Sequence, residues 1–207
     1  MKKIIITLLV SLMMAAPSMG QAIQGYSTIF KMQTYTAYYS DSIQTSTFVI
    51  YKLYRPQQKV KRDKFTFKSY HSLPYFRYEG TVYDKGHLVP AADRAASERE
   101  MKETFYYINA VPQHYRLNRG SWKKLETAVR NLSQKDSLLI ICGGCDWHPQ
   151  DSLVPENCFK VVYSLSKRKP VYYKVFRNDS GASSRDERSL LNIFPIEYVE
   201  RLLRGSK

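Results

Sequence analysis

The chain has 207 residues, of which 43% are hydrophobic and 24% are charged, as in an ordinary globular protein. These fractions exclude a disordered tail, a coiled coil and a collagen-like rod, and they supply enough apolar side chains for a core. The 32 lysines and arginines outnumber the 18 aspartates and glutamates, for a formal net charge of +14. Such an excess favours a polyanionic partner, either a nucleic acid or an anionic surface.

The first twenty residues have the three-part layout of a secretory signal peptide. A short basic start precedes an apolar run over residues 4–16, and a proline and small residues follow it. The run is too short for a comfortable membrane span. We therefore expect cleavage after Gly20, or else after Ala22, rather than a membrane anchor or a buried helix. The mature chain, 21–207, is expected to be one exported domain, periplasmic or extracellular, without a transmembrane anchor.

Export would place the three cysteines, Cys142, Cys145 and Cys158, in an oxidising compartment. One disulfide with one thiol left over is the simplest pairing. The sequence Cys142-Gly-Gly-Cys145 also fits half of a zinc site or a redox motif. No second cysteine pair, clear set of histidine partners or thioredoxin-like setting accompanies it, so structural cysteines are the stronger interpretation.

Two strands are predicted early in the domain, at residues 34–39 and 45–54, because β-branched and aromatic residues dominate both segments. Residues 55–80 are basic and irregular, with aromatic side chains interleaved among the lysines and arginines. That mixture suits a surface that binds phosphates and stacks on bases. It also fits a solvated loop, which is the better interpretation for most of these lysines.

The second half of the chain predicts a strand at 105–111, closed by Pro112, and then a helix from Asn118 to about residue 132. The apolar stripe of this helix recurs at steps of three and four residues, at Trp122, Leu125, Val129 and Leu132. Further strands are predicted at 138–142, 158–165 and 171–176, with a turn at 167–170 and a final helix at 196–203. Strands outnumber helices and are mostly antiparallel, so the predicted class is α+β, with an antiparallel sheet core and flanking helices.

The residues suited to chemistry lie between positions 83 and 130. If a strand ends in a tight bend at Gly86, His87 is presented at the mouth of the turn, where a neutral imidazole can take a proton from water. At about 100° per residue, Asn118, Glu126 and Arg130 fall on one side of the predicted helix. An amide carbonyl is a hard oxygen donor suited to Mg²⁺. The pattern therefore predicts a ββα unit that brings one base and one metal together.

Each of these signals also has a purely structural explanation. A lone histidine is usually a packed or surface residue, and an asparagine at a helix start is usually an N-cap. Glu126 and Arg130, four residues apart, form an exposed ion pair in most helices. General physical chemistry alone supports a basic exported α+β protein, with a nuclease as one option.

The combination is more specific, because three segments resemble the DNA/RNA non-specific endonucleases, or ββα-metal nucleases, in order and spacing. Residues 84–93, Asp-Lys-Gly-His-Leu-Val-Pro-Ala-Ala-Asp, resemble the signature of that family. Residues 104–113 resemble its second strand, and 118–126 the start of its metal-binding helix. A weaker likeness extends from about residue 45 to 172.

The resemblance implies a role for each candidate residue. His87 would be the general base that activates water, and Asn118 the direct protein ligand of Mg²⁺, with Mn²⁺ as an alternative metal. Asp84 would brace the loop. The remaining implied roles are the positioning of metal-bound water and of the histidine loop by Asn109 and Glu126, a place near the scissile phosphate for Arg130, and phosphate binding by Arg62.

Lys85 departs from the family pattern, which usually has arginine between the aspartate and glycine of the signature. Lysine keeps the charge but loses the planar two-pronged grip on phosphate, so a lower rate or an altered substrate preference is expected. An unperturbed histidine base, with a pKa of about 6.5, predicts activity that falls below about pH 6.

The function implied is metal-dependent hydrolysis of DNA and RNA with little sequence preference, giving 5′-phosphate ends; a homodimer is compatible with it. A non-catalytic protein that binds nucleic acid or an anionic surface would explain the charge, but not His87, Asn118 and Glu126 in register. A redox or zinc protein built on Cys142 and Cys145 would leave the whole 83–130 block unexplained.

The family comparison also bears on the cysteines. Cys145 and Cys158 stand where family members more often carry apolar residues, whereas Cys142 lies in a predicted buried strand, where a free thiol packs well. We therefore predict a Cys145–Cys158 disulfide.

Overall fold

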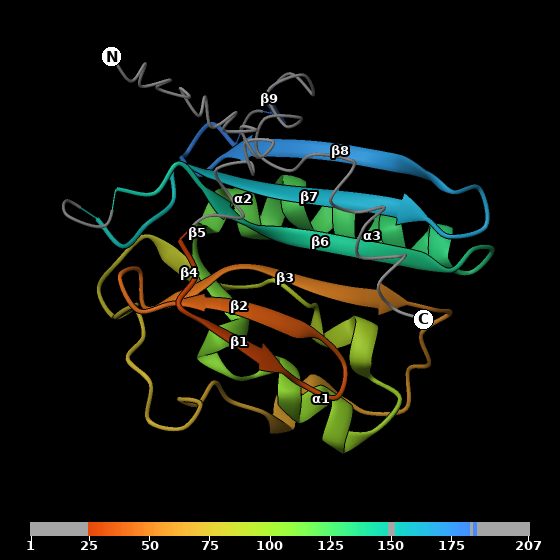
Figure 1. Cartoon of the computed structure of the whole chain (residues 1–207), viewed down its shortest axis with the longest axis horizontal. Helices are drawn as coiled ribbons and strands as arrows, with labels where there is room; N and C mark the ends of the chain where they lie inside the picture. The colour runs from red at the N-terminus through yellow and green to blue at the C-terminus, as the bar shows by residue number, and fades with distance from the viewer. Residues whose placement is uncertain (1–24, 149–151, 183, 186–207) are drawn as a thin grey trace, which may run out of the picture.

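An antiparallel sheet of seven strands forms the body of the computed structural model, which describes residues 25–148, 152–182 and 184–185 (Figure 1). The strand order is β1-β2-β3-β6-β7-β8-β9. The strands are β1 (Thr28–Lys31), β2 (Thr36–Ser40), β3 (Thr45–Leu53), β6 (Leu138–Cys145), β7 (Asn157–Ser164), β8 (Lys169–Arg177) and β9 (Ser184–Arg185). The expected signal peptide and the expected helix at 196–203 lie outside the described residues.

A ββα unit packs on one face of this sheet. Its strands β4 (Tyr83–His87) and β5 (Ala110–His114) pair antiparallel. The chain then enters a helix made of α2 (Tyr115–Leu117), a π-helical turn (Asn118–Trp122) and α3 (Lys123–Ser133). In the view of Figure 1, α3 lies behind β6 and β7. The predicted α+β class, the antiparallel sheet and the strand–strand–helix order are therefore confirmed.

The predicted strand at 105–111 is wrong in its position. Residues Tyr107–Asn109 form a short 3₁₀ turn, and β5 begins only at Ala110 and runs through Pro112. Proline is tolerated inside β5 because β4 and β5 form a separate two-stranded sheet, in which both strands are edges.

The sequence patterns also missed several short elements. Helix α1 (Glu98–Thr104) begins after Ser97, whose side chain accepts a hydrogen bond from the Glu100 amide and so caps the helix. Strands β1 and β9 and the 3₁₀ turns at Arg62–Lys64 and Ala91–Arg94 were not predicted either. The turn predicted at 167–170 is shorter, because Lys169 already begins β8.

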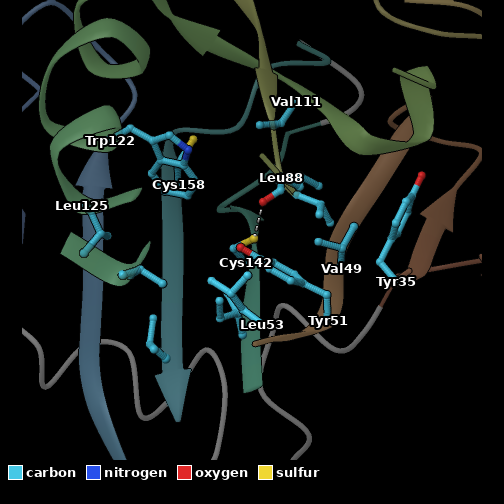
Figure 2. Close-up of a cluster of buried hydrophobic side chains, with 14 of the residues drawn as sticks. Tyr35, Val49, Tyr51, Leu53, Leu88, Val111, Trp122, Leu125, Cys142 and Cys158 are labelled. Atoms are coloured by element: carbon cyan, nitrogen blue, oxygen red, sulfur yellow. Dashed lines mark hydrogen bonds between the residues drawn. The ribbon is translucent and has the colours of Figure 1, made fainter. Parts of the chain in front are cut away.

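The main hydrophobic core lies between the sheet and the ββα unit. The predicted stripe residues Trp122, Leu125 and Val129 belong to this core. Figure 2 shows Trp122 beside Cys158, with Val49 and Tyr51 elsewhere in the same cluster. A second apolar cluster occupies the opposite face of the sheet. Within the described residues, no helix is both long enough and apolar enough to cross a membrane.

The prediction of a Cys145–Cys158 disulfide is wrong, because all three cysteines are buried and none of them forms a disulfide. In the β6–β7 register, Cys158 lies opposite Gly144, while Cys145 lies opposite Asn157. Successive side chains along a strand point to opposite faces, so Cys158 enters the main core and Cys145 enters the cluster on the other side. Two sulfurs on opposite faces of one sheet are not positioned to bond.

Candidate active site

Strand β4 places His87 at its C-terminal end, opposite Ala110 of β5. Gly86 lies within this strand rather than at the tight bend that we expected. A Cβ at Gly86 would come within 2.6 Å of the Gln113 Cβ and 2.7 Å of its Oε1. Glycine is therefore required for the close approach of β4 to the Gln113 side chain, and not for a turn.

The backbone that follows His87 is held by Asn109. The Val89 amide donates to Asn109 Oδ1 at 2.9 Å, and Asn109 Nδ2 donates to the carbonyls of Val89 at 3.0 Å and Thr104 at 2.9 Å. The Leu88 amide also donates to the Asn109 carbonyl, at 2.9 Å. The Asn109 side chain is completely buried. It thus braces the histidine segment, but no exposed atom of it is left for the metal-bound water that the family resemblance implied.

The thiol of Cys142 on β6 supports the same segment from the sheet. Its Sγ donates to the Leu88 carbonyl at 3.0 Å, as the dashed line in Figure 2 shows. Burial raises the pKa of this thiol to about 12, so the thiol keeps its proton and remains a hydrogen-bond donor at neutral pH.

The imidazole of His87 packs against two phenylalanine rings. The ring centroids of Phe67 and Phe105 lie 4.7 Å and 5.0 Å from that of His87. The Nε2 atom is buried and has no hydrogen-bond partner among the residues that the structure describes. Burial, with a further contribution from the positive charge of Arg62, lowers the pKa of His87 to about 3. The histidine is therefore neutral at physiological pH, as a proton acceptor must be.

Asp84 holds the start of the helix. Its Oδ2 accepts hydrogen bonds from Asn118 Nδ2 at 2.9 Å and from Arg119 Nε at 2.8 Å, and its Oδ1 accepts from Arg119 Nη2 at 2.6 Å. Partial burial alone would raise the pKa of Asp84, but the hydrogen bonds from Arg119 and Asn118 and the charge of Arg119 outweigh it and hold the pKa below its usual value. Asp84 was expected to brace the loop, and in the structure it holds Asn118 and Arg119.

This arrangement orients the Asn118 amide. A carboxylate accepts hydrogen bonds but does not donate them, so the atom that faces Asp84 must be the amide nitrogen. The carbonyl oxygen Oδ1 is then the group that Asn118 presents elsewhere. A neutral oxygen suits Mg²⁺, which keeps several of its waters, so this residue fits the implied metal. Among the described residues, no group of three or more His, Cys, Asp or Glu side chains could hold a metal ion.

The helix is not continuous between Asn118 and Glu126, as the sequence argument assumed. Gly120, with φ −105° and ψ −107°, interrupts the helical backbone inside the π turn. Such wide turns often occur at functional sites. The placement of Asn118 relative to Glu126 and Arg130 therefore follows from this irregular turn and from Asp84, and not from an ideal 3.6-residue period.

Glu126 and Lys160 form a buried pair between α3 and β7. The Lys160 ammonium lies 4.0 Å from Glu126 Oε1 and 4.4 Å from the centre of the Trp122 ring. The Lys160 side chain is 1% exposed and that of Glu126 is 14% exposed. Burial raises the pKa of Glu126, and the charge of Lys160 opposes part of that rise.

Arg130 pairs with Asp93, which closes the 84–93 segment, rather than with Glu126. Arg130 Nη1 donates to Asp93 Oδ1 at 2.7 Å, and Asp93 Oδ2 accepts a hydrogen bond from the Tyr51 hydroxyl at 3.2 Å. The Asp93 side chain is 2% exposed and that of Arg130 is 20% exposed. Asp93 thus fixes the direction of a guanidinium that still reaches the surface.

The two expected phosphate contacts occupy different settings. The ammonium of Lys85 lies 5.6 Å from the centre of the Tyr78 ring, which fits a cation–π contact. Arg62 is exposed in the short turn Arg62–Lys64, and its charge acts on His87. Arg62 therefore contributes to the electrostatic field of the same site.

The structure adds three residues that the sequence analysis did not assign to the site: Asp93, Arg119 and Lys160. Each had a signal. Asp93 ends the matched 84–93 segment, and Arg119 follows the candidate metal ligand. Lys160 is a single charge within the apolar run 158–163, where a lysine needs a partner when it is buried.

Comparison with known proteins places the chain in a family. Residues 15–206 match the family described as DNA/RNA non-specific endonuclease. The chain belongs to this family.

Several curated relatives are nucleases. The chain is 41% identical over 73 residues to the mitochondrial nuclease EXOG of Danio rerio, covering 35% of this chain and 21% of the relative. It is 36% identical over 76 residues to the mitochondrial endonuclease G of Homo sapiens, covering 37% and 26%. A nuclease of Nostoc sp. is 36% identical over 98 residues, covering 42% and 34%. The matched segments span about a fifth to a third of these relatives' lengths.

A solved structure shares the fold. A chain from the crystal structure of an EndoG/EndoGI complex superposes with a TM-score of 0.66 and 22% identity, covering 81% of this chain and 83% of that chain. At this level of identity the similarity establishes the fold alone.

Proposed function

We propose that this chain is an exported, metal-dependent endonuclease that hydrolyses DNA and RNA phosphodiester bonds with little sequence preference. The observation that carries the proposal is a combination of two residues. His87 is neutral at the end of β4, and the hydrogen bond from the Asn118 amide nitrogen to Asp84 leaves the Asn118 carbonyl oxygen available to a metal. Family membership supports the same reaction.

In this proposal His87 takes a proton from the attacking water. Its Nε2 is buried against aromatic rings without a partner, so Nδ1 is the nitrogen that accepts the proton, and Nε2 carries the hydrogen of the neutral ring. The depressed pKa keeps His87 unprotonated before the reaction. Asn109 and Cys142 hold the backbone behind it, which keeps the ring aimed at one point.

Asn118 Oδ1 would hold Mg²⁺, or Mn²⁺, with water completing the coordination. When bound, the ion supplies Lewis-acid stabilisation of the charge that develops on the phosphate and on the leaving 3′ oxygen, which leaves the product with a 5′-phosphate. Glu126, whose pKa is raised by burial and lowered in part by the charge of Lys160, would orient water around this ion. The bracing of Asn118 by Asp84 sets the direction of the carbonyl before the ion binds.

Positive side chains would hold the substrate phosphates. Asp93 orients the Arg130 guanidinium, which suits a scissile phosphate in need of charge stabilisation. Arg62 and Lys85 would contact phosphates nearby. Phosphate contacts carry no direct sequence information, so a site built on them accepts DNA and RNA of any sequence.

The test is the cleavage of supercoiled plasmid and of structured RNA by the purified protein, with Mg²⁺ and with chelator. His87→Ala and Asn118→Ala should each lower the rate by about 10²- to 10⁴-fold. The control His71→Asn changes an exposed histidine at a positive φ of 47°, which asparagine tolerates, and should cleave like the wild type. Chelator should abolish cleavage by every variant.

The rival is a non-catalytic protein that binds nucleic acid, and two further measurements separate it. His87→Ala should still bind nucleic acid, because the basic surface is intact. Excess Mg²⁺ should partly restore Asn118→Ala and leave His87→Ala unchanged. If both variants are folded and cleave within a few-fold of the wild type, the proposal is wrong.

A further inference from the structure

A continuous stack of π systems leads from His87 to the surface. The Phe67 ring lies 4.7 Å from His87 and 5.5 Å from Tyr107, at 29° to the Tyr107 plane. Tyr107 stacks on Tyr75 at 3.8 Å with the two planes 2° apart. The Arg77 guanidinium lies 5.1 Å from the centre of the Tyr75 ring. We call these five residues the aromatic stack.

The inner half of the stack is fixed by the backbone. The Tyr107 amide donates to the Lys68 carbonyl at 3.0 Å, and the Lys68 amide donates to the Phe105 carbonyl at 2.9 Å. These bonds join the segment that carries Phe67 to the segment that carries Tyr107. The outer half is different, because Tyr75 and Arg77 belong to the irregular segment before β4, and Arg77 is exposed.

The outer end of the stack borders an open surface hollow of about 560 Å³. This volume lies within the usual range for sites that bind small groups. The residues that line it are Gln44, Ser69, Ser72, Leu73, Pro74, Tyr75, Phe76, Arg77 and Leu153. Among the described residues that line the hollow, Arg77 carries the one formal charge, which is positive. The hollow therefore joins an aromatic face to a cation, which suits a flat group attached to a phosphate.

We propose that Tyr75 and Arg77 form a stacking site for one nucleobase of a single-stranded segment, at a position along the strand that is separated from the phosphate at His87 by the rings of Phe67 and Tyr107. This inference rests on the proposed nuclease function and adds a substrate preference to it. Every base offers a π face, and an aromatic ring or a guanidinium stacks on it without reading the sequence. Bases inside a duplex already stack on each other, so the site favours single-stranded regions, loops and ends.

The competing explanation is that these rings pack only to hold the irregular segment in place. That explanation predicts that losing the Tyr75 ring weakens all substrates alike, through a disturbed loop. A base-stacking role predicts that the loss depends on whether the substrate carries a base. An abasic oligonucleotide has the same phosphates without the bases, and it therefore separates the two explanations.

The experiment measures dissociation constants in chelator, which prevents cleavage, for a single-stranded oligonucleotide, its abasic counterpart and a duplex. Stacking is worth about 1–3 kcal/mol per base, so the wild type should bind the normal strand roughly 5- to 150-fold more tightly than the abasic strand. Tyr75→Leu should lose most of that ratio and leave abasic and duplex binding unchanged. Tyr75→Phe, which keeps the ring, should retain it.

Arg77→Ala is a second variant, which removes the exposed outer member of the aromatic stack and leaves its four rings in place. Arg77→Ala should lower the preference for the normal strand over the abasic strand, by a smaller factor than Tyr75→Leu does. The inference fails if the wild type binds the normal and abasic strands equally, or if Tyr75→Leu keeps the wild-type ratio. A protein that cleaves plasmid without any base-dependent ratio would overturn the stacking site alone. Base-dependent binding without cleavage would overturn the proposed function and leave the stacking site standing.

Discussion

The lowered pKa of His87 predicts an acid-dependent loss of stability that one substitution removes. Burial and Arg62 bring the pKa to about 3 in the folded protein, against about 6.5 in the unfolded chain. Between these two values the unfolded state binds the proton and the folded state does not, so the stability rises with pH. The group contributes nothing above about pH 7.5 and destabilises the fold as the pH falls through 6.5.

The magnitude follows from the two pKa values. At pH 5 the unfolded histidine is almost fully protonated and the folded one is neutral, so this residue lowers the free energy of unfolding by about 2 kcal/mol relative to pH 7.5. The penalty grows until the pH approaches 3. His87→Gln cannot take up the proton and should lack this part of the pH dependence.

The assay is urea unfolding of the wild type, His87→Gln and the control His71→Asn at pH 7.5 and pH 5.0. Asparagine is chosen for the control because position 71 has a positive φ of 47°, which asparagine tolerates. The loss of stability on acidification should be about 2 kcal/mol smaller in His87→Gln than in either other protein. Equal losses in all three would show that the pKa of His87 is not depressed, and the reasoning would fail.

The lowered pKa of His87 also changes the expected pH profile of cleavage, because the loss of activity caused by protonation of His87 should begin only well below pH 6. Arg62→Ala should move this loss of activity to higher pH, which cleavage rates measured over a pH series will show. Asp84→Asn should raise the Mg²⁺ concentration needed for half-maximal rate, because it removes the carboxylate that orients Asn118, the proposed metal ligand. Lys160→Met leaves Glu126 buried without its cation and should cost about 3–5 kcal/mol in urea unfolding. Nucleic-acid binding should weaken steeply between about 50 and 200 mM salt.

The parts of the fold that depend on local patterns were predictable. The stripe of the α3 helix was visible in the sequence because its apolar residues recur at helical spacing, and Trp122, Leu125 and Val129 are buried as expected. The order strand, histidine, strand, helix came from three segments that resemble the family in order and spacing. The prediction failed at 105–111, where aromatic residues resemble a strand. There the chain turns, because the buried Asn109 side chain binds the backbone of two other segments.

Relationships across the sheet were not predictable from the chain alone. The comparison with the family suggested a Cys145–Cys158 bond, but the β6–β7 register sends the two side chains to opposite faces. A shift of one residue would have reversed that result. Likewise, Glu126 and Arg130 are four residues apart on one helix, yet each finds its partner on another element, Lys160 in one case and Asp93 in the other.

The four charges in these two pairs bear on function as well as on folding. Two are acidic and two basic, so they cancel, and the net charge of +14 belongs to the rest of the chain. Buried ion pairs are weak evidence for stability, because well-packed apolar residues often serve as well or better. Their presence on α3 and on the segment that follows His87 therefore calls for another explanation. The proposed phosphate-cleaving site would need an arginine and a carboxylate fixed in direction before substrate arrives, and Asp93 and Lys160 would hold Arg130 and Glu126 in that way.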